Sequence, residues 1–409
     1  MNCRFCKQEL KYDLVDLFHS PASNSFLSPR ELNEPEVFFP LRIKICDHCF
    51  LVQIDEYKKS DAIFNDQYVY FSSYSTSWLA HSKAYVEMMI SRFGFDSNHL
   101  IMELASNDGY LLQYFKEKNI PVLGIEPTAN TAEVAINKGI PTIVRFFGRE
   151  LALELKTQSH KADLIVGNNV LAHVPDIVDF VSGMKIILSE NGVITMEFPH
   201  LMNLIDQNQF DTIYHEHYSY LSLYTVAQIF RAQDLRVFDV EQIHTHGGSL
   251  RIFACHEDCK QHSTQERVSV LLHIELEKGM NQLQYYSHFT ERCLQVKVDL
   301  MQFLLDQKKQ GKTVAAYGAA AKGNTLLNYC GIKNDLISYV IDLNPSKQNK
   351  YLPGSYIPVF DETYLISHKP DVLIILPWNI KDEIILQLNY AKEWGCKFYI
   401  AIPSLQQVA

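Results

Sequence analysis

Two Cys-x-x-Cys pairs near the start of the chain constrain its fold more than any other feature. Cys3 and Cys6 form the first pair, and Cys46 and Cys49 form the second. Such a turn lets two thiolates converge on one tetrahedral ion, and two turns complete a closed site with four sulfur ligands. The second pair follows the alternating stretch Leu41-Arg-Ile-Lys-Ile45, which predicts a strand leading into a hairpin-like knuckle. We therefore expect one structural Zn²⁺ held by these four cysteines.

Other interpretations of these cysteines stay open. The two pairs are alternatively unrelated buried or redox-active thiols, and His48 is an alternative ligand in place of one cysteine. The gap between the pairs is longer than is usual, and its four prolines predict a loop-rich excursion. Four thiolates leave no position for water or substrate, which argues against a catalytic metal.

Composition narrows the class of protein. The 409 residues carry 37 Lys and Arg against 47 Asp and Glu, a formal net charge of −10, which argues against a nucleic-acid-binding protein. The 47% of hydrophobic residues is typical of globular proteins. Nine cysteines, an odd number, argue against a disulfide framework. The N-terminus resembles no signal peptide and no apolar run is long enough to span a membrane. We expect a cytoplasmic protein with no membrane partner.

From about residue 97, buried strands alternate with amphipathic helices. The expected strands are His99–Ala105, Val122–Glu126, Ala162–Gly167 and Gly192–Glu197. Such alternation indicates an α/β fold with a mostly parallel, doubly wound sheet, in which ligands bind beyond the carboxyl ends of the strands. The central segment is therefore predicted to be a Rossmann-like domain.

The turn after the first of these strands distinguishes a dinucleotide site from an S-adenosylmethionine site. Glu126 ends the second strand, where an acidic residue accepts hydrogen bonds from ribose hydroxyls. A dinucleotide turn needs several glycines beside the pyrophosphate, and only Gly109 is present. S-adenosylmethionine has no phosphate, and its usual pattern is an acid followed by alternating glycines. Glu103 and Gly109 match it, whereas Ala105 and Asn107 replace two glycines. A turn that binds nothing remains an alternative.

A second Rossmann-like unit is predicted near the C-terminus. Residues 262–310 have the pattern of one long amphipathic helix, and a strand over Thr313–Gly318 follows it. Lys322 and the N-terminus of the next helix form a candidate anion site. A structural remnant of a dinucleotide fold explains the same residues equally well.

The run Tyr214-His-Glu-His217 contains four consecutive side chains that accept, donate or move protons. His215 and His217 share a face only if the segment is extended. A helical zinc site needs histidines four residues apart, which this run does not have. A polar loop with solvated histidines is the alternative interpretation.

Over nearly its whole length the chain resembles the nucleotide-sugar C-methyltransferases that act at C-3′ of 4-keto-deoxy sugars. The motifs that carry the resemblance are the paired cysteines, Tyr68-Val-Tyr70-Phe-Ser-Ser73, Glu103–Gly109, Asn169-Val-Leu-Ala-His173, Tyr214–His217, His246-Gly-Gly-Ser-Leu-Arg251 and Gly318-x-x-x-Lys322-Gly-Asn324. Ala105 stands where the family usually has glycine.

The resemblance implies a base-catalysed mechanism with S-adenosylmethionine as methyl donor. A ketone at C-4′ acidifies the C-3′ proton, and His217 is the candidate base that removes it. Tyr214 is expected to donate to the enolate oxygen. Glu216 is expected to orient an imidazole or bind sugar hydroxyls, and His173 to contact the sugar. This methyl transfer itself needs no metal.

The remaining ligand contacts are expected from the same motifs. The candidate cofactor-binding residues are Glu103, Ala105, Asn107, Gly109, Glu126 and Asn169. The candidate substrate-binding residues are Tyr68, Tyr70, His215, Arg251 and Lys322, with Arg251 and Lys322 expected near phosphate. His244 and His246 are expected to be supporting or exposed residues.

Three units are predicted: a zinc-binding module over residues 1–60, a methyltransferase domain over 61–245 and a Rossmann-like domain over 246–409. The expected substrate is a keto-deoxy sugar linked to dTDP or GDP, and the protein is expected to be a monomer or a weak homo-oligomer. Two other functions remain: an NAD-dependent nucleotide-sugar oxidoreductase, and a non-catalytic zinc scaffold.

Overall fold

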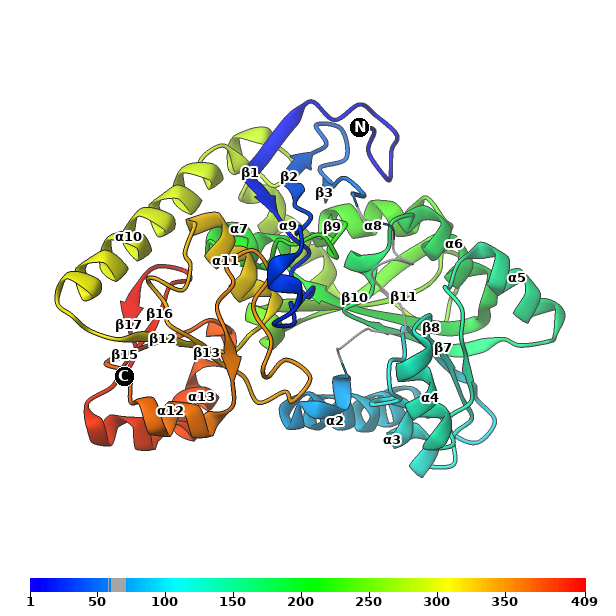
Figure 1. The fold of residues 1–409 in the computed structure, drawn as a ribbon. Helices are drawn as coiled ribbons and strands as arrows, with labels where there is room; N and C mark the ends of the chain where they lie inside the picture. Colours follow the sequence, from blue (N-terminus) through cyan, green and yellow to red (C-terminus); the bar gives the residue numbers. More distant parts are fainter. Residues whose placement is uncertain (58, 60–70) are drawn as a thin grey trace.

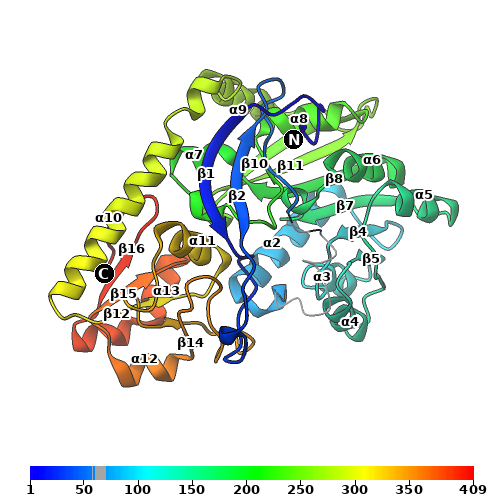
Figure 2. The same ribbon diagram turned by 45° about the horizontal axis from the view of Figure 1, so that its top comes forward.

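The computed structural model describes residues 1–57, 59 and 71–409, which form three β-sheets and the helices around them (Figure 1). Tyr68 and Tyr70, two of the expected substrate-binding residues, lie outside the described residues. The central and C-terminal sheets lie on opposite sides of the molecule, and the N-terminal strands lie between them (Figures 1 and 2). No helix in the described part of the chain is both long enough and apolar enough to cross a bilayer.

The central sheet has seven strands in the order β10-β11-β8-β7-β4-β5-β6. Its strands are β4 (Ile101–Leu104), β5 (Val122–Ile125), β6 (Thr142–Ile143), β7 (Ala162–Asn168), β8 (Leu188–Pro199), β10 (Leu235–Ile243) and β11 (Ser249–His256). The five strands from β8 to β6 are parallel, and β11 is antiparallel to both of its neighbours. All residues of β4 and β5 are buried, as expected for strands covered on both faces. The doubly wound sheet predicted from the sequence is confirmed.

Helices cover both faces of this sheet. The first face packs against α5 (Arg149–Thr157), α6 (Ile177–Ile187) and α8 (Leu223–Arg231). The second face packs against α2 (Thr76–Phe93), α3 (Leu112–Glu117) and α4 (Ala129–Asn137). Figure 1 shows the two layers above and below the strands. A short helix, α7 (Leu201–Asp206), follows β8.

The C-terminal sheet has the order β14-β13-β12-β15-β16-β17. Its strands are β12 (Val314–Tyr317), β13 (Val340–Ile341), β14 (Val359–Phe360), β15 (Val372–Ile375), β16 (Lys397–Ile400) and β17 (Gln406–Gln407), with helices α11 (Ala321–Cys330), α12 (Glu362–His368) and α13 (Lys381–Gln387). All pairs are parallel except β16 with β17. The predicted second Rossmann-like unit is therefore present.

Each of these two sheets reverses its strand order once. The chain runs outward from β4 through β5 to β6, and the next strand, β7, pairs on the other side of β4. It does the same at β12, with β13 and β14 on one side and β15 on the other. Loops that leave the carboxyl ends of neighbouring strands diverge at such a point and open a crevice for ligands.

The N-terminal sheet has four strands, and the fourth comes from the middle of the chain. It consists of β1 (Tyr12–Ser20), β2 (Phe39–Ile45), β3 (Val52–Ile54) and β9 (Ser219–Tyr220), all antiparallel. The second cysteine pair lies in the β2–β3 turn, as predicted. The segment between the two cysteine pairs is less irregular than its prolines suggest, because β1 occupies nine of its residues and packs its apolar side against α10 and α11.

The expected single helix over 262–310 is wrong, because the structure has two helices there. α9 (Glu266–Glu277) ends before Gly279, whose φ of +83° is left-handed, and α10 begins after a short 3₁₀ turn and spans Phe289–Lys309. Glycine adopts this conformation at little cost, which is why it ends helices. α9 packs on the central sheet, and α10 packs on the N-terminal and C-terminal sheets.

Two of the expected domain boundaries cut through sheets. β9 completes the N-terminal sheet although it lies far beyond residue 60, and β11 belongs to the central sheet although it lies beyond residue 245. The change from the central to the C-terminal sheet takes place along α9 and α10.

We expect Glu275→Ala to lower the free energy of unfolding by about 3–5 kcal/mol, because it breaks a fully buried polar cluster. The Glu275 side chain has no solvent exposure and lies 2.6 Å from His200 Nε2. It also accepts the backbone N–H groups of Leu223 and Tyr224 at the start of α8. Urea denaturation measures the loss. Glu277→Ala, two residues further along α9 and exposed, is the control; an equal effect of the two variants would contradict the prediction.

Candidate active site

The four N-terminal cysteines converge as a metal site requires. Their sulfur atoms all lie within 4.8 Å of one another, with Cys3 Sγ 3.5 Å from Cys49 Sγ and Cys6 Sγ 3.5 Å from Cys46 Sγ. With Zn–S bonds of about 2.3 Å, a tetrahedral site places its sulfurs at such separations. The arrangement fits one zinc ion with four thiolate ligands. His48 is exposed and is not part of the cluster.

The two knuckles have matching backbone geometry. Lys7 and Phe50, the residues after each Cys-x-x-Cys, both have left-handed φ values of +64° and +60°. The Lys7 N–H donates to the Cys3 carbonyl and the Phe50 N–H to the Cys46 carbonyl. Gln53 Nε2 donates to Cys3 Sγ at 3.3 Å, which adds a hydrogen bond of the kind that orients metal ligands.

Side chains beside the cysteines connect the cluster to the central domain. Arg4 donates to the Pro175 carbonyl at 2.7 Å and to the Ile54 carbonyl at 2.6 Å. Pro175 lies in the loop between β7 and α6 that also lines the main cavity. The zinc cluster therefore supports a cavity loop through one guanidinium group.

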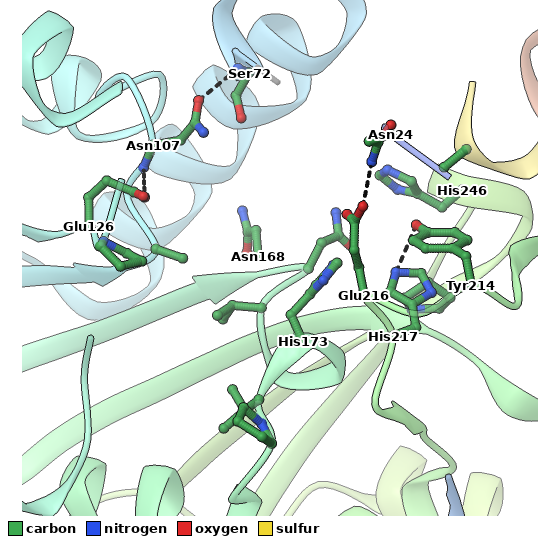
Figure 3. A pocket seen from close by; sticks show the side chains of 18 of the residues that line it. Asn24, Ser72, Asn107, Glu126, Asn168, His173, Tyr214, Glu216, His217 and His246 are labelled. Carbon is green, nitrogen blue, oxygen red and sulfur yellow. Dashed lines mark hydrogen bonds between the residues drawn. The ribbon is translucent and has the colours of Figure 1, made fainter. Parts of the chain in front are cut away.

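A cavity of about 480 Å³ lies where the three units meet. The carboxyl ends of β4, β5 and β7, the start of α11 and the turn after β1 all contribute to its walls, so it opens at the strand-order reversals of both parallel sheets. Figure 3 shows the polar groups that point into it. Of the site residues predicted from the sequence, the ones that line the cavity are Ala105, Asn107, Glu126, Asn169, His173, Tyr214, Glu216, His217 and Lys322.

The turn after β4 keeps the geometry of a glycine-rich loop without most of the glycines. Ala105, Asn107 and Gly109 have φ values of +57°, +48° and +74°. Asn107 donates its N–H to Glu126 Oε2 and accepts the Ser72 N–H at its side-chain oxygen. Only Gly109 has no room for a side chain, because a Cβ there would lie 2.3 Å from Ile140. The replacement of two glycines therefore leaves the shape of the turn intact.

Two carboxyl groups lie at this end of the cavity. Glu126 lines it and accepts the N–H groups of Asn107 and Thr128, each at 2.8 Å, and burial raises its pKa. Glu103 is buried beneath the turn and does not line the cavity. Burial raises the Glu103 pKa well above its usual range, and a hydrogen bond with Tyr110 offsets part of that rise. The two acids therefore differ: Glu126 faces the ligand space, and Glu103 supports the turn.

Asn168 and the Phe146–Phe147 pair line the cavity and were missed in the sequence. Both polar side-chain atoms of Asn168, the last residue of β7, are buried without a protein partner. Buried amides are normally hydrogen-bonded, so these atoms fit a ligand. Its position at the end of a buried strand beside the strand-order reversal was the available signal. Phe146 and Phe147 form an apolar wall, and nothing in their local sequence distinguishes them from core residues.

His217 is held in one tautomer. Its Nδ1 lies 2.9 Å from the Thr212 carbonyl oxygen, which only accepts, so the hydrogen is on Nδ1. Nε2 is then an acceptor, and the Tyr214 hydroxyl donates to it at 2.9 Å (Figure 3). Burial, followed by the nearby His173, lowers the His217 pKa well below its usual value. The imidazole is therefore neutral at physiological pH with its basic nitrogen toward the Tyr214 hydroxyl.

Two further histidines surround this pair. The ring of His173 lies edge-on to His217 with centroids 4.6 Å apart. Burial lowers the pKa values of both His173 and His246 to about 4. His246 lines the cavity, so the expectation of a merely supporting or exposed residue holds for the exposed His244 but not for His246.

Lys322 reaches the cavity from the start of α11. Its Nζ donates to Asn379 Oδ1 at 2.8 Å and lies 4.8 Å from the centre of the Trp378 ring. Burial lowers its pKa to about 8, and the opposite charge of Asp211 counteracts this. Asp211 is fully buried and accepts the Trp378 Nε1 hydrogen at 2.7 Å. Lys322 therefore places a cation at the wall formed by the C-terminal domain.

Two residues expected to bind substrate point elsewhere. His215 Nε2 contacts the Pro40 carbonyl at 3.2 Å, because the 214–217 segment turns and sends its two histidines to opposite sides. Arg251 does not line the cavity, since its guanidinium pairs with Glu197 and with Glu241 at 2.8 Å. The two glycines before Arg251 do make close approaches, to Trp378 and Asn203.

Comparisons with known proteins match three successive parts of the chain. Family models match residues 3–64, described as a zinc binding domain, residues 79–240, described as a methyltransferase domain, and residues 244–403, described as a C-methyltransferase C-terminal domain. The C-methyltransferase NovU of Streptomyces niveus is 33% identical over 401 residues, which cover 98% of this chain and 95% of NovU. The chain belongs to the S-adenosylmethionine-dependent C-methyltransferases.

Solved structures of other methyltransferases are similar to part of this C-methyltransferase. Magnesium protoporphyrin IX methyltransferase of Synechocystis, solved with bound SAM, has a TM-score of 0.34 and 12% identity over 44% of this chain and 79% of its own. A SAM-dependent methyltransferase of Anabaena variabilis has a TM-score of 0.37 and 14% identity, and the match covers 50% of this chain and 99% of its own.

Membership of this family excludes the two other functions considered from the sequence. A C-methyltransferase is neither an NAD-dependent oxidoreductase nor a scaffold without activity.

We expect purified protein to contain one zinc ion per chain, held by the four cysteines. Cys46→Ser removes one thiolate ligand, so its zinc content should fall well below that of the wild type, and its melting temperature should fall with it. Metal analysis and a thermal scan measure these changes. His48→Ala, in the same knuckle, should keep its zinc; loss of zinc from that variant instead would contradict the four-cysteine site.

Proposed function

We propose that this enzyme methylates C-3′ of a 4-keto-6-deoxy sugar linked to dTDP or GDP. The observation that carries the proposal is the neutral His217, whose basic nitrogen adjoins the Tyr214 hydroxyl in the same cavity as the strand ends that hold a cofactor. A base beside a phenol suits removal of a proton next to a ketone.

The cofactor belongs at the carboxyl ends of β4, β5 and β7. Glu126 suits the ribose hydroxyls, the turn of Ala105 and Asn107 suits close approach of the methionine part, and the amides of Asn168 and Asn169 offer further hydrogen bonds. Glu103 and Gly109 keep the turn in shape from below. S-adenosylmethionine supplies the methyl group as an electrophilic sulfonium.

His217 Nε2 removes the C-3′ proton in this proposal. Its Nδ1 hydrogen bond to Thr212 fixes the ring and stabilises the imidazolium that forms. Proton abstraction by a positioned base contributes about 10²–10⁴ in rate. Before this step the Tyr214 hydroxyl turns from Nε2 to the C-4′ oxygen, which frees the Nε2 lone pair and lets the phenol donate to the developing enolate. Glu216 and His173 contact the sugar hydroxyls.

The nucleotide diphosphate belongs at the C-terminal wall. Lys322 and Lys347 are cations that line the cavity, and Ala320 and Ala321 bring the N-terminus of α11 to the same wall. The N-cap residue, Ala320, has no side chain to cap the first N–H groups of this helix. Uncapped N–H groups beside two lysines suit a diphosphate.

We expect His217→Ala to abolish methyl transfer while leaving the affinity for S-adenosylhomocysteine unchanged. In D₂O the wild type should exchange the C-3′ proton of the substrate for deuterium, and the variant should not. Mass spectrometry follows both reactions. Tyr214→Phe is the companion variant and should slow both steps without stopping them. Full turnover by His217→Ala would refute the base assignment.

The low pKa of His217 predicts an unusual pH dependence. Because burial lowers this pKa, the imidazole remains neutral, and therefore basic, at pH values where an ordinary histidine is protonated. The acidic limb of the kcat/KM profile should therefore lie below pH 6.5, the usual imidazole value. A limb near or above that value would show that another group sets the profile.

A panel of 4-keto nucleotide sugars tests the substrate class. Incubation with S-adenosylmethionine should yield a singly methylated sugar, and NMR should place the new methyl on C-3′. The ketone acidifies C-5′ as well, so a methyl at C-5′ would overturn the position but keep the chemistry. No product from either the dTDP or the GDP series would overturn the proposed substrate.

A further inference from the structure

One polar side chain in the cavity comes from the N-terminal part of the chain. Asn24 is in a turn after β1, closed by a hydrogen bond from the Ser25 N–H to the Ala22 carbonyl at 3.0 Å. Ala22 and Ser23 are buried, whereas Asn24 lines the cavity. Nothing in the motifs of the sequence points to this residue.

Asn24 binds the carboxylate of the Tyr-His-Glu-His segment. Its Nδ2 donates to Glu216 Oε1 at 2.8 Å, and Figure 3 shows the two side chains meeting beside His217. Glu216 is only 5% exposed. This hydrogen bond favours one orientation of the Glu216 carboxyl group, and losing it would leave a buried polar group without that partner.

The turn that carries Asn24 is itself held by the C-terminal domain. Asn324 Nδ2, on α11, donates to the Ser23 carbonyl at 2.6 Å. Leu27 and Tyr351 exchange two backbone hydrogen bonds of 3.0 and 2.8 Å. Asn24 is therefore fixed on both flanks by the domain that also supplies Lys322.

We propose that Asn24 is a positioning residue of the methyl transfer: it holds the Glu216 carboxylate in the orientation that binds the sugar beside His217. The inference rests on the proposed function. Asn24 acts through Glu216, and its anchoring to α11 couples the placement of that carboxylate to the wall expected to bind the diphosphate. The N-terminal module thus takes part in catalysis as well as in stability.

The first test removes the hydrogen bond. Asn24→Ala should lower kcat by about tenfold to a hundredfold, because small displacements of a positioned group cost that much. The KM for the sugar nucleotide should change less than kcat, and zinc content and S-adenosylhomocysteine affinity should match the wild type. Asn33→Ala, an exposed asparagine in the same module, is the control and should behave as the wild type.

The second test replaces the attractive contact between residue 24 and Glu216 with a repulsive one, using a side chain of the same shape. Asn24→Asp places a second carboxylate next to Glu216, and two such groups share one proton. At low pH the shared proton replaces the lost hydrogen bond, and at high pH the two charges repel. The ratio of variant to wild-type kcat should therefore fall as pH rises. The other titratable side chains that line the cavity are Tyr110, Glu126, His173, Asp176, Asp179, Tyr214, His217, His246, Lys322 and Lys347.

The outcomes separate this inference from the proposed function. Suppose that Glu216→Gln is impaired, so that Glu216 does matter. The positioning role is then overturned if Asn24→Ala keeps the wild-type kcat and if the ratio of Asn24→Asp to wild-type kcat does not change with pH. If Glu216→Gln is fully active instead, the role of Glu216 in the proposed function fails, and the positioning role fails with it. A kcat loss in Asn24→Ala accompanied by loss of zinc or of cofactor affinity would show a general structural defect and would also overturn it.

Discussion

The pairing of β3 with β9 is the constraint on which the arrangement of the active site depends. Val52 pairs with Tyr220 and Gln53 with Ser219, and the Ile54 N–H donates to the Tyr218 carbonyl. These contacts join the cysteine knuckles to the backbone directly after His217. Gln53 serves both sides, because its backbone is in the pairing and its side chain contacts Cys3 Sγ. His217 and the cysteine cluster are therefore parts of one hydrogen-bonded unit.

The cavity combines a low-dielectric interior with a small number of fixed charges. Burial raises the pKa values of the acids Glu126 and Asp211 and lowers those of the bases His173 and His217. Each shift favours the neutral form. Such surroundings suit the proposed methyl transfer between a sulfonium and an enolate, because the opposite charges of the two reactants disappear together and water would stabilise them separately. Lys322 supplies positive charge in a chain whose net charge is −10.

Most of the fold could be predicted from the sequence, because its strands are short, continuous runs of apolar residues. The runs that became β4, β5, β7 and β12 were identified within a few residues, and the paired cysteines indicated their own cluster. Gly279 was a local signal for the break between α9 and α10, but the apolar periodicity on both sides concealed it. β1 was missed because its pairing with β2 is decided by contact with α10 and α11, which lie hundreds of residues away.

For the site, local motifs predicted which residues are polar and clustered but not where each side chain points. Tyr214, Glu216 and His217 were found together, whereas His215 turns toward Pro40, a partner 175 positions away. Arg251 pairs across the sheet with Glu197, a partner 54 positions away. Asn24 carries no motif at all, and its place in the cavity depends on a turn held by Asn324. Each difference arises from a contact distant in sequence.

Because β9 comes from the middle of the chain, the N-terminal sheet is completed late during synthesis. The first three strands leave the ribosome early, but their sheet lacks its fourth strand until residue 220 has been made, 166 residues after the end of β3. Until then β3 presents an unpaired edge, and the cysteine knuckles are the local means of holding the hairpin together. An ion captured by the nascent knuckles would bridge that interval, so metal supply during translation would influence how much chain reaches the native state.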